Sequence, residues 1–146
     1  QGNLQSITNA LGHVTQLSEY DANGRVGKVV DANGLTTTFT YHVRGWLAER
    51  KVSGGGLNET TRYDYDGLGQ LLSVTLPDGG SLSYSYDDAH RLTDIRDAQG
   101  NRIHYVLDNQ SNRLAEEISD ASGQLLRKVE KAYDHMYRVT QVSGGN

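Results

Sequence analysis

Short segments in which apolar and polar residues alternate recur along the chain. In SLSYSYD, residues 81–87, Leu82, Tyr84 and Tyr86 alternate with serines, and LTTTFTY, residues 35–41, alternates in the same way around threonines. A period of two is typical of a β-strand with one half-buried face. The longest apolar runs are only a few residues, far short of a membrane-spanning helix. The pattern therefore predicts a chain built from short, half-buried strands.

These segments belong to an internal repeat with a period of about 21 residues. The copies begin at Tyr20, Tyr41, Tyr65, Tyr86, Leu107 and Tyr133. Their starts are spaced 21, 24, 21, 21 and 26 residues apart, and the insertions fall at glycine-rich joints. Each copy contains a strand, a turn, a second strand and a second turn. About six copies therefore predict about twelve short antiparallel strands.

The turns share a chemical signature, with Asp at the first position and often Gly at the fourth. An Asp side chain accepts the backbone N–H two residues further on, and Gly adopts a left-handed backbone angle without steric cost. The first turn of a copy shows this in Asp21–Gly24 and Asp66–Gly69, and the second turn in Asp31–Gly34, Asp97–Gly100 and Asp120–Gly123. This spacing predicts β-hairpins.

Alignment of the copies predicts three rows of side chains that cross the strands. The first row holds the residues that begin the copies. The second row, two residues earlier and on the same face, holds Ser18, Phe39, Tyr63, Tyr84, Tyr105 and Lys131. The third row, just past the first turn, holds Val26, Leu47, Leu71, Leu92, Leu114 and Val139. Because nine Tyr stand against one Phe and one Trp, and a Tyr hydroxyl needs water or a partner, we expect a half-buried surface rather than a deep core.

Residues 113–133 also allow a helix. One helical face would carry Leu125, Leu126, Val129 and Ala132 or Tyr133. Gly123 interrupts this helix, and the repeat places strands there, so the helix ranks second.

The repeated pattern Tyr-Asp-x-x-Gly-Arg-Leu-x-x-Val, followed by Asp-x-x-Gly, resembles the YD repeat of the RHS (rearrangement hotspot) proteins, whose relatives include insecticidal toxin-complex subunits and teneurins. It is cleanest in YDANGRVGKVVDANG, residues 20–34. The motif residues expected to have structural roles are Tyr20, Asp21, Gly24, Tyr41, Tyr65, Asp66, Gly69, Tyr86, Asp87, Asp108, Tyr133 and Asp134. Three departures stand out: His42 replaces the Asp of the second copy, Leu107 replaces the Tyr of the fifth, and the fifth copy carries an extra residue before Arg113.

The resemblance implies an all-β fold in which repeated antiparallel hairpins form one long curved sheet, a section of an RHS-type β-shell. Such a shell encloses a toxin polypeptide until the parent protein is secreted or delivered to a target cell. We expect residues 1–146 to be repeat throughout, with no separate toxin domain. The family's self-cleavage motif begins Asp-Pro-x-Gly, whereas the only proline, Pro77, follows Leu76. The expected partners are adjacent repeats and the enclosed toxin, with self-association through the sheet edges.

Composition narrows the alternatives. The formal net charge of −4 and the scattered Lys and Arg residues favour neither nucleic acid nor membrane insertion. With no Cys, there is no disulfide framework and no thiolate metal site. The opening QGNLQSITNA has neither a basic start nor an apolar segment, so no signal peptide is predicted.

Candidate catalytic and metal sites are weak. Asp64 and Asp66 lie about 7 Å apart on a strand, a separation that suits an inverting glycosidase. However, Asp66 is the residue that recurs at the turns, which favours a structural role and no enzyme. The histidines show no ligand spacing, and the DANG turns have Gly fourth rather than sixth, unlike a calcium loop. No catalytic residue, metal or cofactor is predicted. The histidines are His13, His42, His90, His104 and His135.

One binding alternative remains open. Rows of tyrosine on a sheet offer rings on which sugars stack, and YD repeats are associated with carbohydrate ligands in the family. The candidate stacking residues are Tyr63, Tyr65, Tyr84 and Tyr86. Rings buried against Leu and Val would favour a structural role, whereas an open row would favour carbohydrate.

Overall fold

The computed structural model describes residues 2–145, and every regular element in that range is a strand. The strands are β1 (Ser6–Thr8), β2 (Val14–Ser18), β3 (Lys28–Val30), β4 (Thr36–Tyr41), β5 (Leu47–Gly54), β6 (Leu57–Tyr65), β7 (Leu71–Thr75), β8 (Ser81–Tyr86), β9 (Leu92–Asp97), β10 (Arg102–Leu107), β11 (Arg113–Ser119), β12 (Leu125–Tyr133) and β13 (Val139–Gly145). They form one 13-stranded sheet in sequence order, and its end strands, β1 and β13, do not pair with each other. The predicted all-β fold of repeated hairpins is confirmed. The segment for which a helix was the alternative forms β11 and β12.

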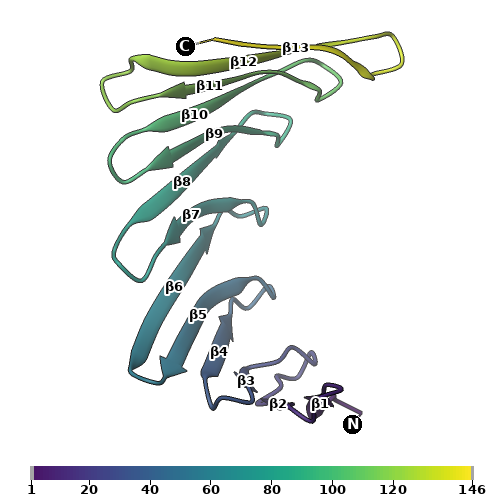
Figure 1. Ribbon diagram of the computed structural model, residues 1–146, viewed down its shortest axis with the longest axis vertical. Coiled ribbons are helices and arrows are strands. Elements are labelled where there is room, and N and C mark those ends of the chain that lie inside the picture. The colour runs from purple at the N-terminus through teal and green to yellow at the C-terminus, as the bar shows by residue number, and fades with distance from the viewer. Residues whose placement is uncertain (1, 146) are drawn as a thin grey trace. The chain divides into compact units, whose positions relative to one another are not determined.

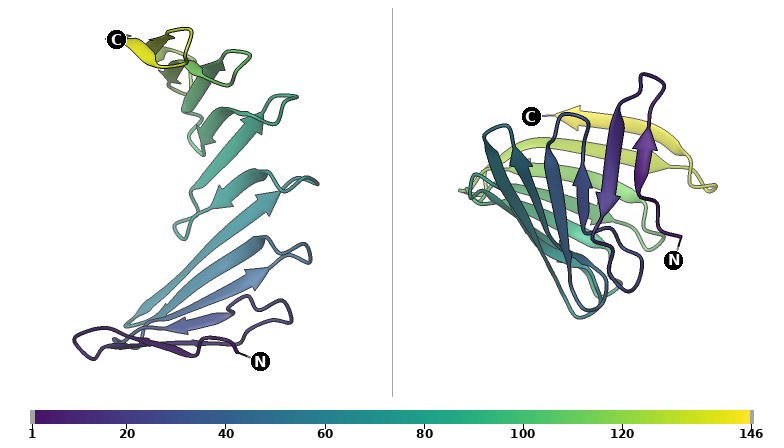
Figure 2. Two further views of the ribbon diagram at one scale, coloured as in Figure 1. Left: turned by 90° about the vertical axis from the view of Figure 1, so that its right-hand side faces the viewer. Right: turned by 90° about the horizontal axis from the view of Figure 1, so that it is seen from below.

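The chain divides into two compact units. Unit 1 comprises Gln1–Asp64 and Thr75–Asp78, and unit 2 comprises Tyr65–Val74 and Gly79–Asn146. Unit 1 holds β1 to β5 and most of β6, and unit 2 holds most of β7 and all of β8 to β13. Within each unit the hairpins follow one another as a single layer of strands (Figures 1 and 2).

Strand pairing fixes the register of the rows. A register shift follows the first strand of several copies, so that Tyr41 lies opposite Leu47, Tyr86 opposite Leu92 and Tyr133 opposite Val139. Such a β-bulge places two residues of one strand opposite one residue of its neighbour. These pairs bring the first and third rows together across the three hairpins.

The fifth copy differs from the sequence prediction. Leu107 lies opposite Arg113 rather than Leu114, so the assignment of Leu114 to the third row was wrong. The loop is also of ordinary length, because the Asp108 N–H donates to the Asn112 carbonyl as the Asp21 N–H does to that of Arg25. The predicted extra residue before Arg113 is therefore absent, and Asn112 occupies the place that Arg25 has in the first copy.

The two faces of unit 2 differ in polarity. Tyr84 lies opposite Ile95, and Ile103 lies between Ile95 and Ile118. Because directly opposed residues share a face, these residues lie with Tyr86, Tyr105 and Tyr133 on what we call the tyrosine face. The other, polar face carries Ser83, Ser85, Asp94, Arg102, His104 and Glu117.

The single layer leaves little of the chain fully buried. Among the described residues only Val52, Val74, Tyr105 and Ala115 are buried, and no large side chain is completely enclosed. The expectation of a half-buried surface without a deep core is confirmed. No helix long and apolar enough to span a membrane occurs among residues 2–145.

The end strand β13 lacks the usual protection of an exposed edge. Natural edges are blunted by charge, by proline or by a covering element. β13 has the sequence VTQVSGG, with neither charge nor proline, and all seven residues are exposed. This strand is therefore the most probable surface for pairing with another chain.

We predict that the 146-residue chain self-associates through β13. Light scattering across a concentration series should show an average mass that rises with concentration. Val142→Lys, which places a charge in β13, should weaken this association because an edge lysine opposes further strand pairing.

The matched control is Val43→Lys. Val43 is 92% exposed in a turn rather than on an edge, so its replacement should leave the association unchanged. A chain that stays monomeric at high concentration, or equal effects of the two lysines, would contradict the prediction.

Candidate functional site

The most regular chemical feature of the chain is the aspartate that opens each turn. Its Oδ1 accepts two backbone N–H groups, from the residues two and four positions further on. In the fourth copy, Asp87 accepts from Ala89 at 3.0 Å and from Arg91 at 2.9 Å. The same pair of bonds occurs at Asp21, Asp31, Asp66, Asp97, Asp108, Asp120 and Asp134. One carboxylate oxygen thus satisfies backbone donors that a tight loop leaves unpaired.

The second carboxylate oxygen is often used by the residue four positions on. The Nε of Arg25, Arg91 and Arg138 donates to Oδ2 of the turn aspartate at 2.6, 2.7 and 2.8 Å. The shorter Asn112 does the same to Asp108 through Nδ2 at 2.7 Å. The recurrent Arg of the motif therefore acts as a clamp on the turn, and Asn substitutes for it.

The fourth turn position has a left-handed backbone whether or not it is glycine. Gly24 and Gly69 have φ of 78° and 91°, and glycine adopts such angles freely. His90, Ser111 and Tyr137 adopt φ of 62°, 70° and 60° at the equivalent place. The hydrogen bonds of the aspartate therefore hold the turn even where the residue carries a Cβ.

His42 replaces the aspartate of the second copy without changing the loop. Its N–H donates to the Trp46 carbonyl and its carbonyl accepts from Gly45, both at 2.7 Å. The imidazole replaces one hydrogen bond of the carboxylate, because its Nδ1 accepts from the Arg44 N–H at 3.3 Å. The imidazole also stacks on Trp46, with 5.5 Å between ring centroids. The departure changes the chemistry of the turn and keeps its geometry.

The tyrosines of the first row tie each copy to the preceding one. The hydroxyl of Tyr41 donates to the Val26 carbonyl at 3.0 Å, and that of Tyr86 to the Leu71 carbonyl at 2.9 Å. Tyr133 donates to Arg113 at 3.0 Å, and Tyr20 donates to Leu4. Val26, Leu71 and Arg113 are third-row residues, so the bonds follow the repeat. Leu107 has no hydroxyl for this bond.

Neighbouring turns are also joined along one edge of unit 2. The Gln70 amide donates to the His90 carbonyl at 3.1 Å, and its Oε1 lies 3.1 Å from His90 Nδ1. Arg91 Nη1 donates to the Asp108 carbonyl at 2.6 Å. These bonds connect the third copy to the fourth and the fourth to the fifth, in addition to the strand pairing.

These contacts shift several pKa values. The hydrogen bonds from Arg91, first from its side chain and then from its backbone, lower the pKa of Asp87. For Asp21 and Asp66 the bond from the backbone four residues on is the main cause of a lowered pKa. Burial, with a smaller contribution from the negative charge of Asp66, raises the pKa of Tyr86. A lowered pKa at Asp66 does not suit the general acid that a glycosidase requires.

The candidate stacking tyrosines do not form an open row. Tyr63, Tyr65, Tyr84 and Tyr86 are all half-buried, and the Tyr86 hydroxyl is already bonded to a backbone carbonyl. Within residues 2–145 no cluster of three or more His, Asp or Glu side chains could hold a metal ion.

The polar face carries a ladder of opposed charged residues on adjacent strands, which was not predicted from the sequence. His104 lies opposite both Asp94 and Glu117, and Glu117 lies opposite Lys128. The His104 ring is 3.2 Å from Asp94, which Arg102 also contacts. Burial opposes the charge of Asp94, but the bond from Arg102 helps to keep its pKa lowered. Counting residues outward from the Asp97 turn would have revealed the opposition of Asp94 and His104.

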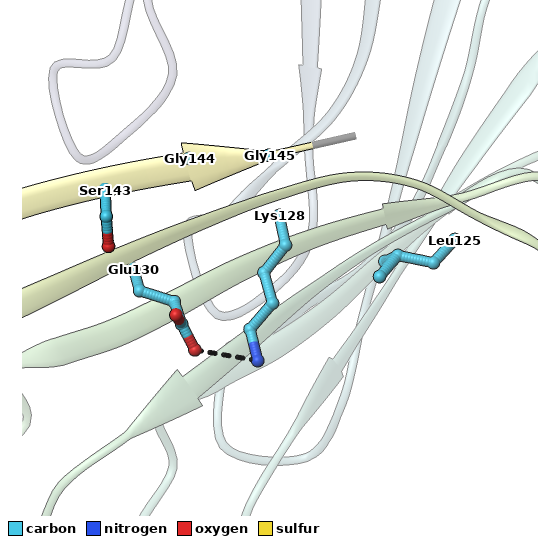
Figure 3. Close-up of a pocket in the computed structure, with 6 residues that line it drawn as sticks. All are labelled: Leu125, Lys128, Glu130, Ser143, Gly144 and Gly145. Atoms are coloured by element: carbon cyan, nitrogen blue, oxygen red, sulfur yellow. Dashed lines mark ion pairs between the residues drawn. The ribbon is translucent and has the colours of Figure 1, made fainter.

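A shallow pocket lies at the end of this ladder, between β12 and β13 (Figure 3). Lys128 Nζ is 2.8 Å from Glu130 and 3.3 Å from Glu117. The bonds from Glu130 and then Glu117 raise the pKa of Lys128. Ser143, Gly144 and Gly145 complete the wall. The lysine is thus already paired, and the pocket presents no free charge from it.

Comparison with known proteins places the repeat in a family. The profile of the RHS Repeat family matches residues 1–32, 20–57, 55–81, 65–102 and 86–125. The tRNA3(Ser)-specific nuclease WapA of Bacillus spizizenii is 34% identical over 104 residues, which cover 68% of this chain and 4% of the relative. The probable deoxyribonuclease RhsA of Dickeya dadantii is 32% identical over 111 residues, which cover 70% of this chain and 8% of the relative. The chain thus spans a small part of these relatives.

Solved structures share the fold. The crystal structure of TcdB2-TccC3-Cdc42 superposes with a TM-score of 0.77 and 20% identity, covering 87% of this chain and 7% of that one. A Tc holotoxin pore of Photorhabdus luminescens superposes with a TM-score of 0.66 and 16% identity, covering 90% of this chain and 9% of that one. At these identities the likeness establishes the fold alone.

Removing one inter-repeat hydroxyl should destabilise the sheet. Tyr86→Phe leaves the Leu71 carbonyl without this donor, and the loss of such a bond costs about 0.5–1.5 kcal/mol. Urea unfolding followed by circular dichroism should show a lower midpoint. Tyr84→Phe is the matched control, because the Tyr84 hydroxyl, two residues earlier on the same face, makes no hydrogen bond among the described residues. Equal shifts for both variants would show that the bond adds no stability.

The turn aspartates should make the sheet acid-labile. The folded pKa values of Asp21, Asp66 and Asp87 lie below the ordinary value of 3.8, so their stabilisation is present above that pH and is lost as the pH falls through the folded values. Asp87→Asn retains an acceptor oxygen but loses the charge. The difference in unfolding midpoint between pH 7 and pH 3 should therefore be smaller in this variant than in the native chain.

Asp88→Asn provides the comparison for the acid measurement. Asp88 is exposed and follows Asp87 in the same turn, but Asp87 accepts the backbone bonds. Its neutralisation should leave the pH difference unchanged. An undiminished pH difference in Asp87→Asn would rule out the turn carboxylate as a source of acid lability.

Proposed function

This chain belongs to the RHS repeat family, and from that premise we propose that it is a section of a β-sheet wall that encloses a toxin polypeptide. Its partners are then the adjacent repeats of a longer protein and the enclosed polypeptide. Residues 1–146 serve as repeat throughout, and the chain reaches its site of action as part of the secreted or delivered parent.

The observation that carries the proposal is the single layer of strands without a core. An ordinary domain packs two or more layers around a buried interior. Here only Val52, Val74, Tyr105 and Ala115 are buried among the described residues, and the tyrosine face of unit 2 stays half-exposed within its own layer. A wall suits such a sheet, because its apolar face is covered by what it encloses.

The repeat contacts support extension into a longer array. Several copies bond to the preceding part of the chain through a first-row hydroxyl, as Tyr86 does to Leu71. Repeat proteins gain stability from such interfaces between neighbours and need further repeats or caps at their ends. The uncovered strand β13 is where another repeat would pair.

The relatives' names are consistent with proteins in which the repeat is structural and another part is catalytic. WapA is named a tRNA nuclease, and a further relative from Burkholderia cenocepacia, 26% identical over 111 residues, is named double-stranded DNA deaminase toxin A. This chain covers 4% and 8% of those proteins. We assign catalysis to other parts of such proteins and a structural role to this chain.

The carbohydrate alternative has less support. Sugar stacking requires open ring faces, whereas Tyr63, Tyr65, Tyr84 and Tyr86 are half-buried. No described feature favours it over the wall.

Site-specific photocrosslinking tests the enclosure. A benzophenone amino acid replaces Tyr84 on the tyrosine face or Ser83 on the polar face, within the longer protein that carries this chain. We expect Tyr84 to crosslink to the toxin segment, because the apolar face needs cover, and we expect Ser83 to give no such product. Mass spectrometry identifies the linked peptides.

The result that would overturn the proposal is the absence of toxin crosslinks from both positions in a folded parent protein. Crosslinks from Ser83 alone would instead assign the polar face to the interior and keep the enclosure.

A further inference from the structure

Charged residues on β11 and β12 break the apolar pattern of the tyrosine face: three are cations, and the fourth is Glu116, which lies opposite Tyr105 and Val129. Lys131 stands in the second row, whose other members in unit 2 are Tyr84 and Tyr105. Arg113 stands in the third row, opposite Leu107. Arg127 lies opposite Ile118 and so ends the line of isoleucines. Since the whole chain has a net charge of −4, this gathering does not reflect a generally basic surface.

The three cations line a single groove. It has a volume of about 190 Å³ and is bordered by Arg113, Ala115, Glu116, Arg127, Val129 and Lys131. Arg127 and Lys131 lie on one strand with Val129 between them, and their Cα atoms are about 13 Å apart. Two extended side chains can close that distance around one small group. The groove therefore offers converging positive charge above an apolar floor.

Arg113 is held in place before any ligand arrives. Its guanidinium lies 3.8 Å from the centroid of the Tyr105 ring, and Nη1 is 3.1 Å from Glu116 Oε2. A guanidinium has five N–H donors, so this single contact leaves donors for another acceptor. Glu116 is the only carboxylate that borders the groove, and the cations outnumber it.

The two remaining cations make no ion pair among the described residues, in contrast to most cations of unit 2. Arg91 is paired with Asp87, Arg102 with Asp94, and Lys128 with Glu117 and Glu130. Arg127 and Lys131 therefore have unused charge. Desolvating such charges is favourable only when an opposite charge meets them.

We propose that this groove binds the carboxylate of an acidic side chain in a polypeptide that lies on the tyrosine face. The inference rests on the proposed enclosure and names a chemical feature of the enclosed chain. An Arg–carboxylate pair is charge-assisted and geometrically specific. Around it, Val129 and Ile118 present apolar surface to neighbouring residues of the same polypeptide.

A polypeptide suits the groove better than a polyanion does. Nucleic acids and other polyanions need a track of cations along their backbone, whereas here three cations form one local cluster that also contains the carboxylate of Glu116. The small volume matches one side chain rather than a continuous chain of phosphates. A single acidic residue within an apolar segment has the matching chemistry.

Binding of a labelled peptide of alternating Glu and Val residues to the 146-residue chain tests the assignment, with fluorescence anisotropy as the readout. The same peptide with Gln in place of Glu is the reference. We expect the Glu peptide to bind more tightly, and we expect added salt to reduce this difference because ions screen exposed charges. Arg127→Gln should weaken Glu-peptide binding about tenfold, the change expected for loss of one strong charge-assisted contact.

Arg96→Gln is the matched control. Arg96 is also an exposed strand arginine without an ion pair among the described residues, but it lies opposite Ser83 on the polar face. Its loss should leave binding unchanged. The assignment is overturned if the Gln peptide binds equally well, if the Arg96 and Arg127 variants weaken binding equally, or if inorganic phosphate binds as tightly as the Glu peptide.

The outcome is separable from that of the proposed function. Toxin crosslinks from Tyr84 without selective binding of the Glu peptide would retain the wall and reject the groove. Selective binding without crosslinks would retain an acidic-peptide site and reject the enclosure.

Discussion

The double acceptance of backbone N–H groups by one aspartate oxygen is the interaction on which the sheet depends. A tight loop leaves donors unpaired, and each unpaired buried donor costs free energy. The Asp87 Oδ1 satisfies the N–H groups of Ala89 and Arg91 and thereby fixes the length of the loop. Loop length in turn fixes the register of the hairpin. A slip of one residue would turn Tyr84 and Tyr86 to the other face, so the position of every row follows from the turns.

The correct register brings side chains of neighbouring strands into contact and so supplies the cohesion that a buried core gives to an ordinary domain. A single layer cannot bury its side chains between two packed surfaces, and all but four of the described apolar residues stay at least partly exposed. The chain gains its cohesion from neighbour to neighbour, through strand pairing, through rows of apolar side chains and through hydroxyl bonds such as that from Tyr41 to Val26. Cohesion of this kind grows with the number of copies, which is the thermodynamic character of a repeat protein.

Much of this arrangement could be predicted because local signals and the repeat agree. The alternation in residues 81–87 and the Asp-x-x-Gly turns identify strands and hairpins, and their recurrence decides between strand and helix in residues 113–133. The error in the fifth copy arose because Arg113 was matched to the recurrent Arg of the motif. Asn112 makes the corresponding hydrogen bond to the turn aspartate with a shorter side chain. Leu114, next to the β-bulge, is 36% exposed. In this copy the side chain that bonds to the turn aspartate is Asn rather than Arg, and this replacement could not be seen from residue identity alone.

The contacts between strands could not be predicted from the sequence for a different reason. The contact between Asp94 and His104 joins residues on adjacent strands, and it becomes visible only when the register of the hairpin is known. The cationic groove needs more, because Arg113, Arg127 and Lys131 come from two strands, and Arg113 is recognised as a third-row residue only when Asn112 is matched to the recurrent Arg of the motif. The groove lies where the repeat departs from its pattern, because Lys131 occupies a second-row place that Tyr84 and Tyr105 hold in the preceding copies. In the proposed enclosure, the regular positions maintain the wall and the irregular positions select the enclosed polypeptide, because a row of identical tyrosines presents the same surface to every occupant.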